Sequence, residues 1–329
     1  MSQPAAPEEA TPQTSERKAS PFWQRALPWA ITIACFAWMY RKLARTAGDE
    51  GVVSYLADIF ASVDWIAWLA LMVPYSILYL LIDTLILWRA VNWFNTKIAY
   101  LSLLPVRAST YIISLLNEQV GKGAIAVYLN RTHDVPGWQL GSSLLFIMFC
   151  EGFYLIGWGF IGWTVSKAIL PPELAAIRWA AVGAVLVLAV VLIFFRTDRF
   201  ANVELRDRHL FHAFRRANLG NYLTIVAFRS PALIAAIWVY SKCAALFGID
   251  IPLLDMLGFL PLIFCATLVP GPFRAVAILL WTTLFPEQDP GKMTAFGFVQ
   301  HNFFLVFNAL IGLLFVRRAN QELFGDDAE

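Results

Sequence analysis

The sequence predicts an all-α protein, a polytopic membrane helix bundle, and two observations carry this prediction. Hydrophobic residues make up 59% of the 329 residues, and the mean hydropathy is +0.62. Both values exceed what the core of a soluble protein requires. The apolar residues also gather in runs of about 20, the length that a helix needs to cross the hydrocarbon core of a bilayer.

Six of these apolar runs have the length of one crossing and are bounded by charged residues. We expect full spans at residues 22–40, 63–88, 140–165, 178–195, 222–247 and 293–316. Residues 1–21 are rich in Pro, Glu, Ser and Thr, a composition that predicts a disordered tail. A single transmembrane domain should then cover residues 22–318, with a C-terminal tail at 319–329. The first run follows a long tail of mixed charge, which favours a retained helix over a cleaved signal peptide.

Two further apolar regions, residues 98–129 and 251–285, are too long for one crossing and are interrupted near their middles. Each region is either two crossings or one re-entrant hairpin, and short limbs with polar tips favour the hairpin. Charged residues at bilayer depth cost about 2.5 to 3.5 kcal/mol each. Non-helical backbone at that depth must be buried in protein or line a polar cavity. We therefore expect both interruptions to face a common cavity.

The two interruptions supply the candidate substrate-binding residues. The first, at residues 117–123, contains Asn117, Glu118 and Lys122, and the second, around the Pro270-Gly271-Pro272 motif, is followed by Arg274. One cation from each region, together with the positive ends of the helices that follow, would suit an anionic head group or phosphate. The alternative is that Lys122 and Arg274 form structural salt bridges with nearby acids.

The spans that follow the interruptions add Glu151 and His301 to the predicted substrate-binding set. Glu151 lies near the centre of its span, so it is a candidate proton carrier as well as a counter-ion. His301 belongs to a polar face on the last span, for which helix association is an alternative role. Asp83 and Arg229 fall at similar depths, and we expect a structural salt bridge between them.

Lys and Arg residues predict the orientation in the membrane. The connection at residues 196–221 is rich in arginine and should lie in the cytoplasm. Counting outward from it places both termini and Arg107 on the cytoplasmic side, in what we expect to be a bacterial inner (plasma) membrane. The connection could also form an interfacial helix that binds anionic lipids. Its arginines are Arg196, Arg199, Arg206, Arg208, Arg215 and Arg216.

This topology contains an inverted repeat. The unit at residues 63–165 enters its hairpin from the cytoplasm, and the unit at residues 222–316 enters its hairpin from outside. Gly121 precedes Glu151 by the same interval that separates Gly271 from His301. Inverted repeats with interrupted helices are an architecture of transporters that bind substrate near the membrane midplane.

Several classes of function receive no support from the sequence. The net charge of +2 does not suggest a nucleic-acid partner. The four cysteines lie in apolar spans without a CxxC pair, and we expect neither a metal nor a cofactor. HExxH, Walker and GxSxG motifs are missing, so we do not expect an enzyme. The alternative is a membrane enzyme using Glu118 and Glu151 as an acid–base pair, or an accessory subunit, in lipid head-group or glycolipid modification.

Scattered positions between residues 63 and 316 add a family resemblance. They are Trp88-Arg89, Trp93-Phe94, Asn117 with Gly121 and Gly123, Tyr128-Leu129, Glu151 and the stretch at 268–272. With these residues the chain resembles a divergent member of the flippase-like membrane family typified by the transmembrane region of lysylphosphatidylglycerol synthase. The resemblance implies movement of a lipid or a lipid-linked molecule across the bilayer. Partner proteins are not indicated.

Overall fold

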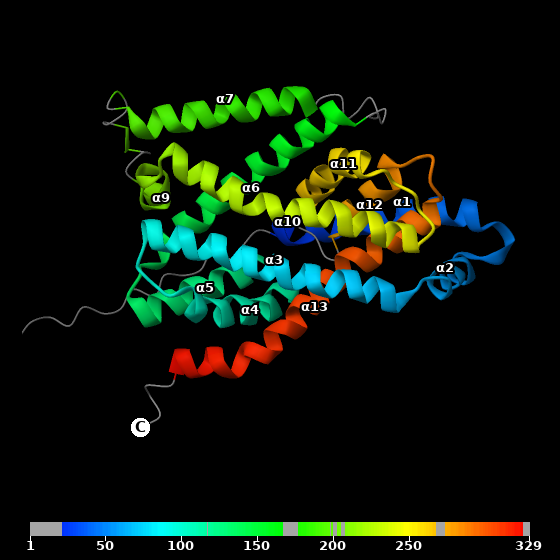
Figure 1. The fold of residues 1–329 in the computed structure, drawn as a ribbon, viewed down its shortest axis with the longest axis horizontal. Helices are drawn as coiled ribbons and strands as arrows, with labels where there is room; N and C mark the ends of the chain where they lie inside the picture. The colour runs from blue at the N-terminus through cyan, green and yellow to red at the C-terminus, as the bar shows by residue number, and fades with distance from the viewer. Residues whose placement is uncertain are drawn as a thin grey trace, which may run out of the picture.

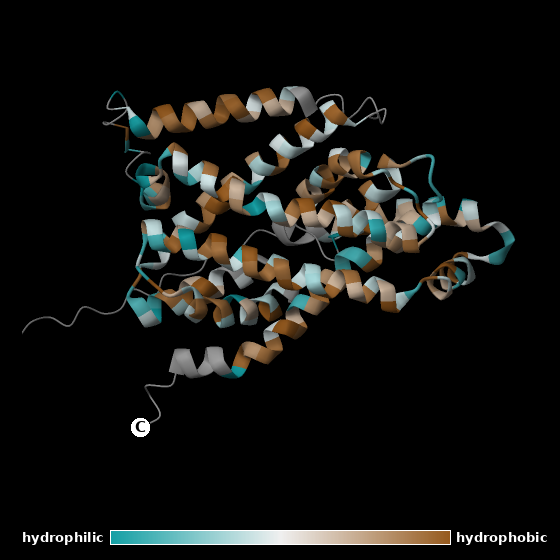
Figure 2. Cartoon of the chain, in the orientation of Figure 1, coloured by the Kyte–Doolittle hydropathy of each residue, from teal (hydrophilic) through white to brown (hydrophobic). Residues whose placement is uncertain are grey.

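The computed structural model describes residues 22–116, 118–166, 177–197, 199, 203–204, 208–267 and 274–324, and these residues form a helical bundle without β-strands (Figure 1). The predicted all-α class is therefore confirmed. Five of the helices are long and apolar enough to cross a membrane. Hydrophobic residues run along most of the length of the helices, and hydrophilic residues gather toward the connections (Figure 2). The fold is that of an integral membrane protein.

Twelve α-helices are present among the described residues. Their bounds are α1 Phe22–Ala47, α2 Val52–Ala61, α3 Trp65–Phe94, α4 Tyr100–Leu116, α5 Glu118–His133, α6 Gly137–Val165, α7 Ile177–Arg196, α9 His212–Arg216, α10 Leu219–Leu246, α11 Leu253–Ala266, α12 Ala275–Leu284 and α13 Pro290–Phe324. Short 3-10 turns precede α2 and α9.

Five of the six expected crossings correspond to α3, α6, α7, α10 and α13. The sixth, at residues 22–40, lies within α1, which continues to Ala47 and is not among the five helices that are long and apolar enough to cross a membrane. Lys42 of α1 donates a hydrogen bond to the Thr282 carbonyl oxygen at 2.8 Å, which attaches this helix to α12. Helix α13 continues beyond residue 318, to Phe324. The N-terminal tail at 1–21 lies outside the described residues.

Helices α3 and α10 form an antiparallel pair at the centre of the bundle. Trp65 meets Phe247 at a ring-centroid distance of 6.1 Å, and Tyr75 meets Tyr240 at 5.9 Å. Residue numbers therefore rise along α3 as they fall along α10. Because one hairpin follows the end of α3 and the other follows the end of α10, the two hairpins enter the bundle from opposite ends (Figure 1).

Each hairpin returns to the end from which it started. Ser143, near the start of α6, donates to Asn95 at the end of α3, so the first hairpin leaves and returns at one end. Gln288, just before α13, donates to the Asp250 carbonyl oxygen just after α10, at the other end. The longest limb, α4, has 17 residues and spans about 25 Å, less than the roughly 30 Å of a hydrocarbon core. The hairpin interpretation is therefore favoured over paired crossings.

The two inverted units pack by equivalent contacts. A Cβ atom at Gly312 of α13 would lie 2.5 Å from the Ala108 carbonyl oxygen of α4. A Cβ atom at Gly162 of α6 would lie 2.6 Å from the Gly258 Cα atom of α11. The interval from Ala108 to Gly258 equals that from Gly162 to Gly312. Small residues therefore let the last span of each unit approach the first hairpin limb of the other.

The first interruption is shorter than the sequence indicated. Helix α5 begins at Glu118, so Gly121 and Gly123 are helical, and only Asn117, which lies outside the described residues, separates α4 from α5. A Cβ atom at Gly121 would overlap the Ser114 hydroxyl and lie 2.9 Å from the Thr110 carbonyl oxygen. This glycine lets the two hairpin limbs pack closely, and the interpretation of residues 117–123 as a non-helical tip was wrong.

The arginine-rich connection is described only in part, and its described residues contain no long amphipathic helix. Helix α9 has five residues, and its Phe214 is buried against the bundle. His212 and Arg216 both hydrogen-bond to the Phe94 carbonyl oxygen, at 3.0 and 3.3 Å. This part of the connection therefore closes the end of α3.

Two apolar clusters fill the bundle, one toward each end. On α3 the buried members of the first cluster end at Tyr75, and those of the second begin at Ile82. On α6 the buried members of the second cluster end at Cys150, and those of the first cluster begin at Tyr154. The charged residues Asp83, Glu151 and Arg229 lie close to the boundary between these clusters.

Candidate functional site

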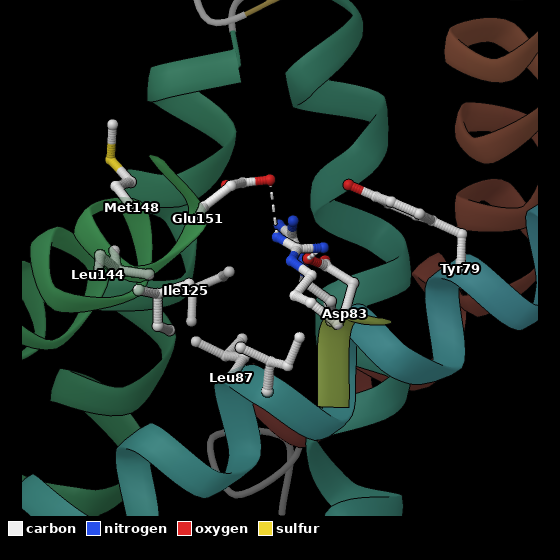
Figure 3. A pocket seen from close by; sticks show the side chains of 11 residues that line it. Tyr79, Asp83, Leu87, Ile125, Leu144, Met148 and Glu151 are labelled. Atoms are coloured by element: carbon white, nitrogen blue, oxygen red, sulfur yellow. Dashed lines mark hydrogen bonds and ion pairs between the residues drawn. The ribbon is translucent and has the colours of Figure 1, made fainter. Parts of the chain in front are cut away.

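A chain of ion pairs occupies the layer between the two apolar clusters. Arg107 Nε lies 2.6 Å from Asp83 Oδ2, and Arg229 Nη1 lies 3.4 Å from Asp83 Oδ1. Arg229 Nη2 lies 3.0 Å from Glu151 Oε1. The four side chains come from α3, α4, α6 and α10, so the chain joins both inverted units (Figure 3).

The four charged side chains are largely buried, so each needs an opposite charge beside it. The exposed fractions of the side chains are 6% for Arg229, 9% for Asp83, 11% for Arg107 and 19% for Glu151. Isolated charges so deep in the protein would cost several kcal/mol each, but two cations here balance two anions. Tyr111 adds a hydrogen bond from its hydroxyl to Asp83 Oδ2 at 3.0 Å. Removing one partner would leave another charge buried and uncompensated.

Arg229 retains unused hydrogen-bonding capacity. Its Nε and Nη1 atoms are buried and have no hydrogen-bond partner among the described residues. Its guanidinium lies 5.6 Å from the centre of the Tyr79 ring, and the Tyr79 hydroxyl points toward the charged cluster (Figure 3). A guanidinium presents donors from all three nitrogens. Arg229 can therefore donate to a further anionic or polar group while it keeps its ion pair with Glu151.

The first cavity lies beside this cluster and holds about 50 Å³. Asp83, Arg107, Glu151 and Arg229 line it together with Tyr79 and apolar residues from α3, α5 and α6. Its volume allows only a few water-sized groups. Its formal charges cancel, so it has no strong preference for an ion of either sign.

The second cavity is lined by residues from both hairpins and also has a volume of about 50 Å³. Ser114 contributes from α4, three residues before the first interruption, and Arg274 contributes from the start of α12, directly after the second. Arg274 adopts a left-handed backbone conformation with φ of 51°, uncommon for a residue other than glycine. Such conformations persist where the surrounding structure fixes them, often at ligand sites. The described residues flanking both interruptions thus meet in one space.

The two cavities share two lining residues, Tyr79 and Arg107. Glu151 lines the first cavity and Arg274 lines the second, so the structure places these two predicted site residues on either side of a shared wall. The predicted ion pair between Asp83 and Arg229 is confirmed. It is one link in a longer chain that includes Glu151.

The other predicted site residues have different outcomes. Asn117 lies outside the described residues, and Glu118 and Lys122 are placed in α5 without described side chains. His301 is buried, and its Nε2 atom accepts a hydrogen bond from Trp281 at 3.1 Å. It is not among the residues lining either cavity. Within the described part of the chain, no cluster of three His, Cys, Asp or Glu side chains could hold a metal ion.

Charge counting placed Arg107 among the cytoplasmic cations and so left it out of the predicted site, whereas the structure buries it inside the bundle. It lies in the second turn of α4, is 9% exposed and binds Asp83. The sequence does contain a pattern that indicates a polar helical face. Its residues, spaced as on one side of a helix, are Arg107, Thr110, Tyr111 and Ser114. Three of these four residues line the second cavity.

These features define an integral membrane helix bundle built from two inverted units around a charged interior. Compared with known proteins, the chain matches no family model, no curated protein and no solved structure at a significant level.

Replacing Arg229 by methionine should destabilise the bundle, because Glu151 would lose its cation while staying largely buried. Breaking a buried ion pair costs about 3–5 kcal/mol in typical proteins. We expect a large fall in the thermal unfolding midpoint of the detergent-solubilised protein. The double variant Arg229→Met/Glu151→Gln should recover much of the loss.

Arg317→Met is the control, because Arg317 is an exposed cation on α13. If Arg229→Met melts like this control, or if the double variant melts no higher than the single one, the ion chain does not have the stabilising role assigned to it.

Proposed function

We propose that this protein is a transporter of the flippase type, which moves an anionic lipid or lipid-linked molecule across the bilayer. One observation carries the proposal: residues beside both hairpin interruptions line a single cavity between helices that enter from opposite ends. In transporters built from inverted repeats, substrate binds at such an interface between interrupted helices. Rocking of one unit against the other would then expose the site to each side in turn.

The charge of the second cavity supports an anionic substrate. Arg107 and Arg274 line it, and no carboxylate is among its described lining residues. Arginine is suited to binding phosphate and carboxylate groups because its planar guanidinium donates several hydrogen bonds in fixed directions. Lys122, in the first turns of α5, is a further candidate for the same site.

The size of the cavities supports a lipid. Each holds about 50 Å³, far below the several hundred Å³ typical of sites that enclose a whole small molecule. A lipid needs to insert only a polar group, because its acyl chains can remain in the bilayer. The resemblance to the flippase-like family, carried by residues such as Trp88, Asn117 and Glu151, points in the same direction.

We prefer transport to the alternative of an enzyme or accessory subunit in lipid modification. The enzyme hypothesis needs Glu118 and Glu151 as an acid–base pair. Glu151 instead lies 3.0 Å from Arg229 in an ion pair, so its described partner is a cation and not a second carboxylate. No contact in the described residues favours that second function.

We also propose that the protein lies in a bacterial inner membrane with both termini and the arginine-rich connection in the cytoplasm. Arg208 and Glu287 are exposed and lie at opposite ends of the bundle. In intact cells, a membrane-impermeant maleimide should label Glu287→Cys but not Arg208→Cys. Both sites should react after permeabilisation, and the reverse pattern would invert the proposed orientation.

Arg274→Gln should slow lipid translocation at least tenfold, because it removes the cation contributed by the second hairpin. Purified protein would be reconstituted into liposomes with fluorescent phosphatidylglycerol, and translocation would be followed by dithionite quenching. Arg317→Gln is the matched control and should translocate lipid like the parent protein. The proposal fails if the parent shows no translocation above empty liposomes, or if Arg274→Gln equals the parent at the same protein density.

A further inference from the structure

The two interior cavities differ in their charge balance, although they share Tyr79 and Arg107. In the first cavity, Asp83 and Glu151 neutralise the two arginines. In the second, the described lining residues include cations and neutral polar groups but no acid. An anion would therefore gain more from entering the second cavity, because none of its described lining residues is a carboxylate.

Asn308 gives the second cavity an unpartnered polar group. Its side chain belongs to α13 and is 3% exposed, and its Oδ1 atom has no hydrogen-bond partner among the described residues. A buried polar atom without a partner costs about 1–3 kcal/mol. Rotation of the amide would present its two N–H donors in place of the oxygen. A ligand with acceptor oxygens would then accept hydrogen bonds from these N–H donors.

Arg107 is the second buried polar group that lines this cavity. Its Nε atom donates to Asp83 at 2.6 Å, and its Nη1 atom donates to Thr110 at 3.3 Å. Among the described residues no hydrogen bond to its Nη2 atom is found, so this nitrogen can donate to a ligand. Because Asp83 and Thr110 fix the guanidinium, Arg107 offers a pre-oriented donor. Arg274, at the start of α12, offers a second guanidinium to the same cavity.

We propose that the second cavity binds the phosphate group of the transported molecule, between Arg107 and Arg274 and against the amide of Asn308. This inference rests on the proposed transport function and specifies its substrate class. Donors converge from α4, α13 and the start of α12, an arrangement that suits a tetrahedral group with acceptor oxygens in several directions. A planar carboxylate would be satisfied by a single guanidinium.

Arg107 would also link the two cavities. The same guanidinium holds Asp83 of the ion chain and faces a ligand in the second cavity. A bound phosphate would compete with Asp83 for this cation, which would leave Asp83 more dependent on Arg229. Phosphate binding is thus coupled to the ion pairs that join the two units.

Binding to the detergent-solubilised protein tests this site apart from transport. The probes are dioctanoyl phosphatidylglycerol, uncharged dioctanoylglycerol and inorganic phosphate, measured by isothermal titration calorimetry. We expect Arg274→Gln to weaken phosphatidylglycerol binding at least tenfold and Asn308→Leu to weaken it several-fold. Arg274→Lys should bind with intermediate affinity. The controls are Arg317→Gln and Asn302→Leu, which alter exposed or half-exposed residues of α13 and should bind like the parent.

The probes also distinguish the source of the phosphate group. Binding of phosphatidylglycerol without inorganic phosphate assigns the site to a lipid head group, and equal binding of both, lost together in Arg274→Gln, assigns it to free phosphate. The inference is overturned if dioctanoylglycerol binds as tightly as phosphatidylglycerol, or if the parent binds neither phosphate probe. Unchanged binding in folded Arg274→Gln and Asn308→Leu would also overturn it.

Translocation measured in parallel separates the two proposals. If the parent translocates lipid while Arg274→Gln binds phosphatidylglycerol normally, the phosphate site is wrong and transport stands. If phosphatidylglycerol binds through Arg274 but the parent translocates no lipid, the site stands and transport is wrong. Thermal unfolding midpoints of every variant identify those that bind weakly because they are unfolded.

Discussion

The ion chain from Arg107 through Asp83 and Arg229 to Glu151 is the constraint on which the interior of this bundle depends. Three of its members belong to the first inverted unit, and Arg229 alone comes from the second. Apolar packing holds the helices together on either side of this layer, but it is non-directional. The charged side chains require specific partners, so they fix which helices meet at mid-depth and how far each is inserted.

The placement of the hairpins follows from the same central layer. Helices α3 and α10 run antiparallel through it, and each ends where a hairpin begins, so the hairpins approach from opposite ends. Close contacts of Gly312 with Ala108 and of Gly162 with Gly258 bring the last span of each unit against the other unit's hairpin. The second cavity forms where these contacts leave the flanks of both interruptions facing each other. Its positive lining contrasts with the balanced charges next to it.

Much of this fold could be predicted from the sequence, because apolar run length and the spacing of interruptions are local properties. The spans, the paired helices of each interrupted region and the equal intervals from Gly121 to Glu151 and from Gly271 to His301 were all readable in this way. The ion pair between Asp83 and Arg229 was also predicted, since both residues fall at similar depth. These predictions needed no knowledge of which side chains touch.

The remaining features depend on contacts between helices that sequence spacing does not reveal. Charge counting places Arg107 on the cytoplasmic side because it treats cations outside the full spans as solvated, whereas Asp83 of α3 holds this residue inside the bundle. Gly121 falls in the predicted interruption at residues 117–123, but it is helical and allows close packing against Ser114 and Thr110. His301 was grouped with the site by its polarity, and it is hydrogen-bonded to Trp281 instead.

The central claim is that the two hairpins meet in the interior, and cysteine crosslinking between them tests it most directly. Ser114→Cys and Arg274→Cys place one thiol in each hairpin on the lining of the second cavity. In membranes, the double variant should form an intramolecular crosslink with a short bifunctional thiol reagent, while pairing Ser114→Cys with Arg317→Cys should not. If both cysteines react with a monofunctional reagent but no crosslink forms at any reagent length, the hairpins do not share a cavity.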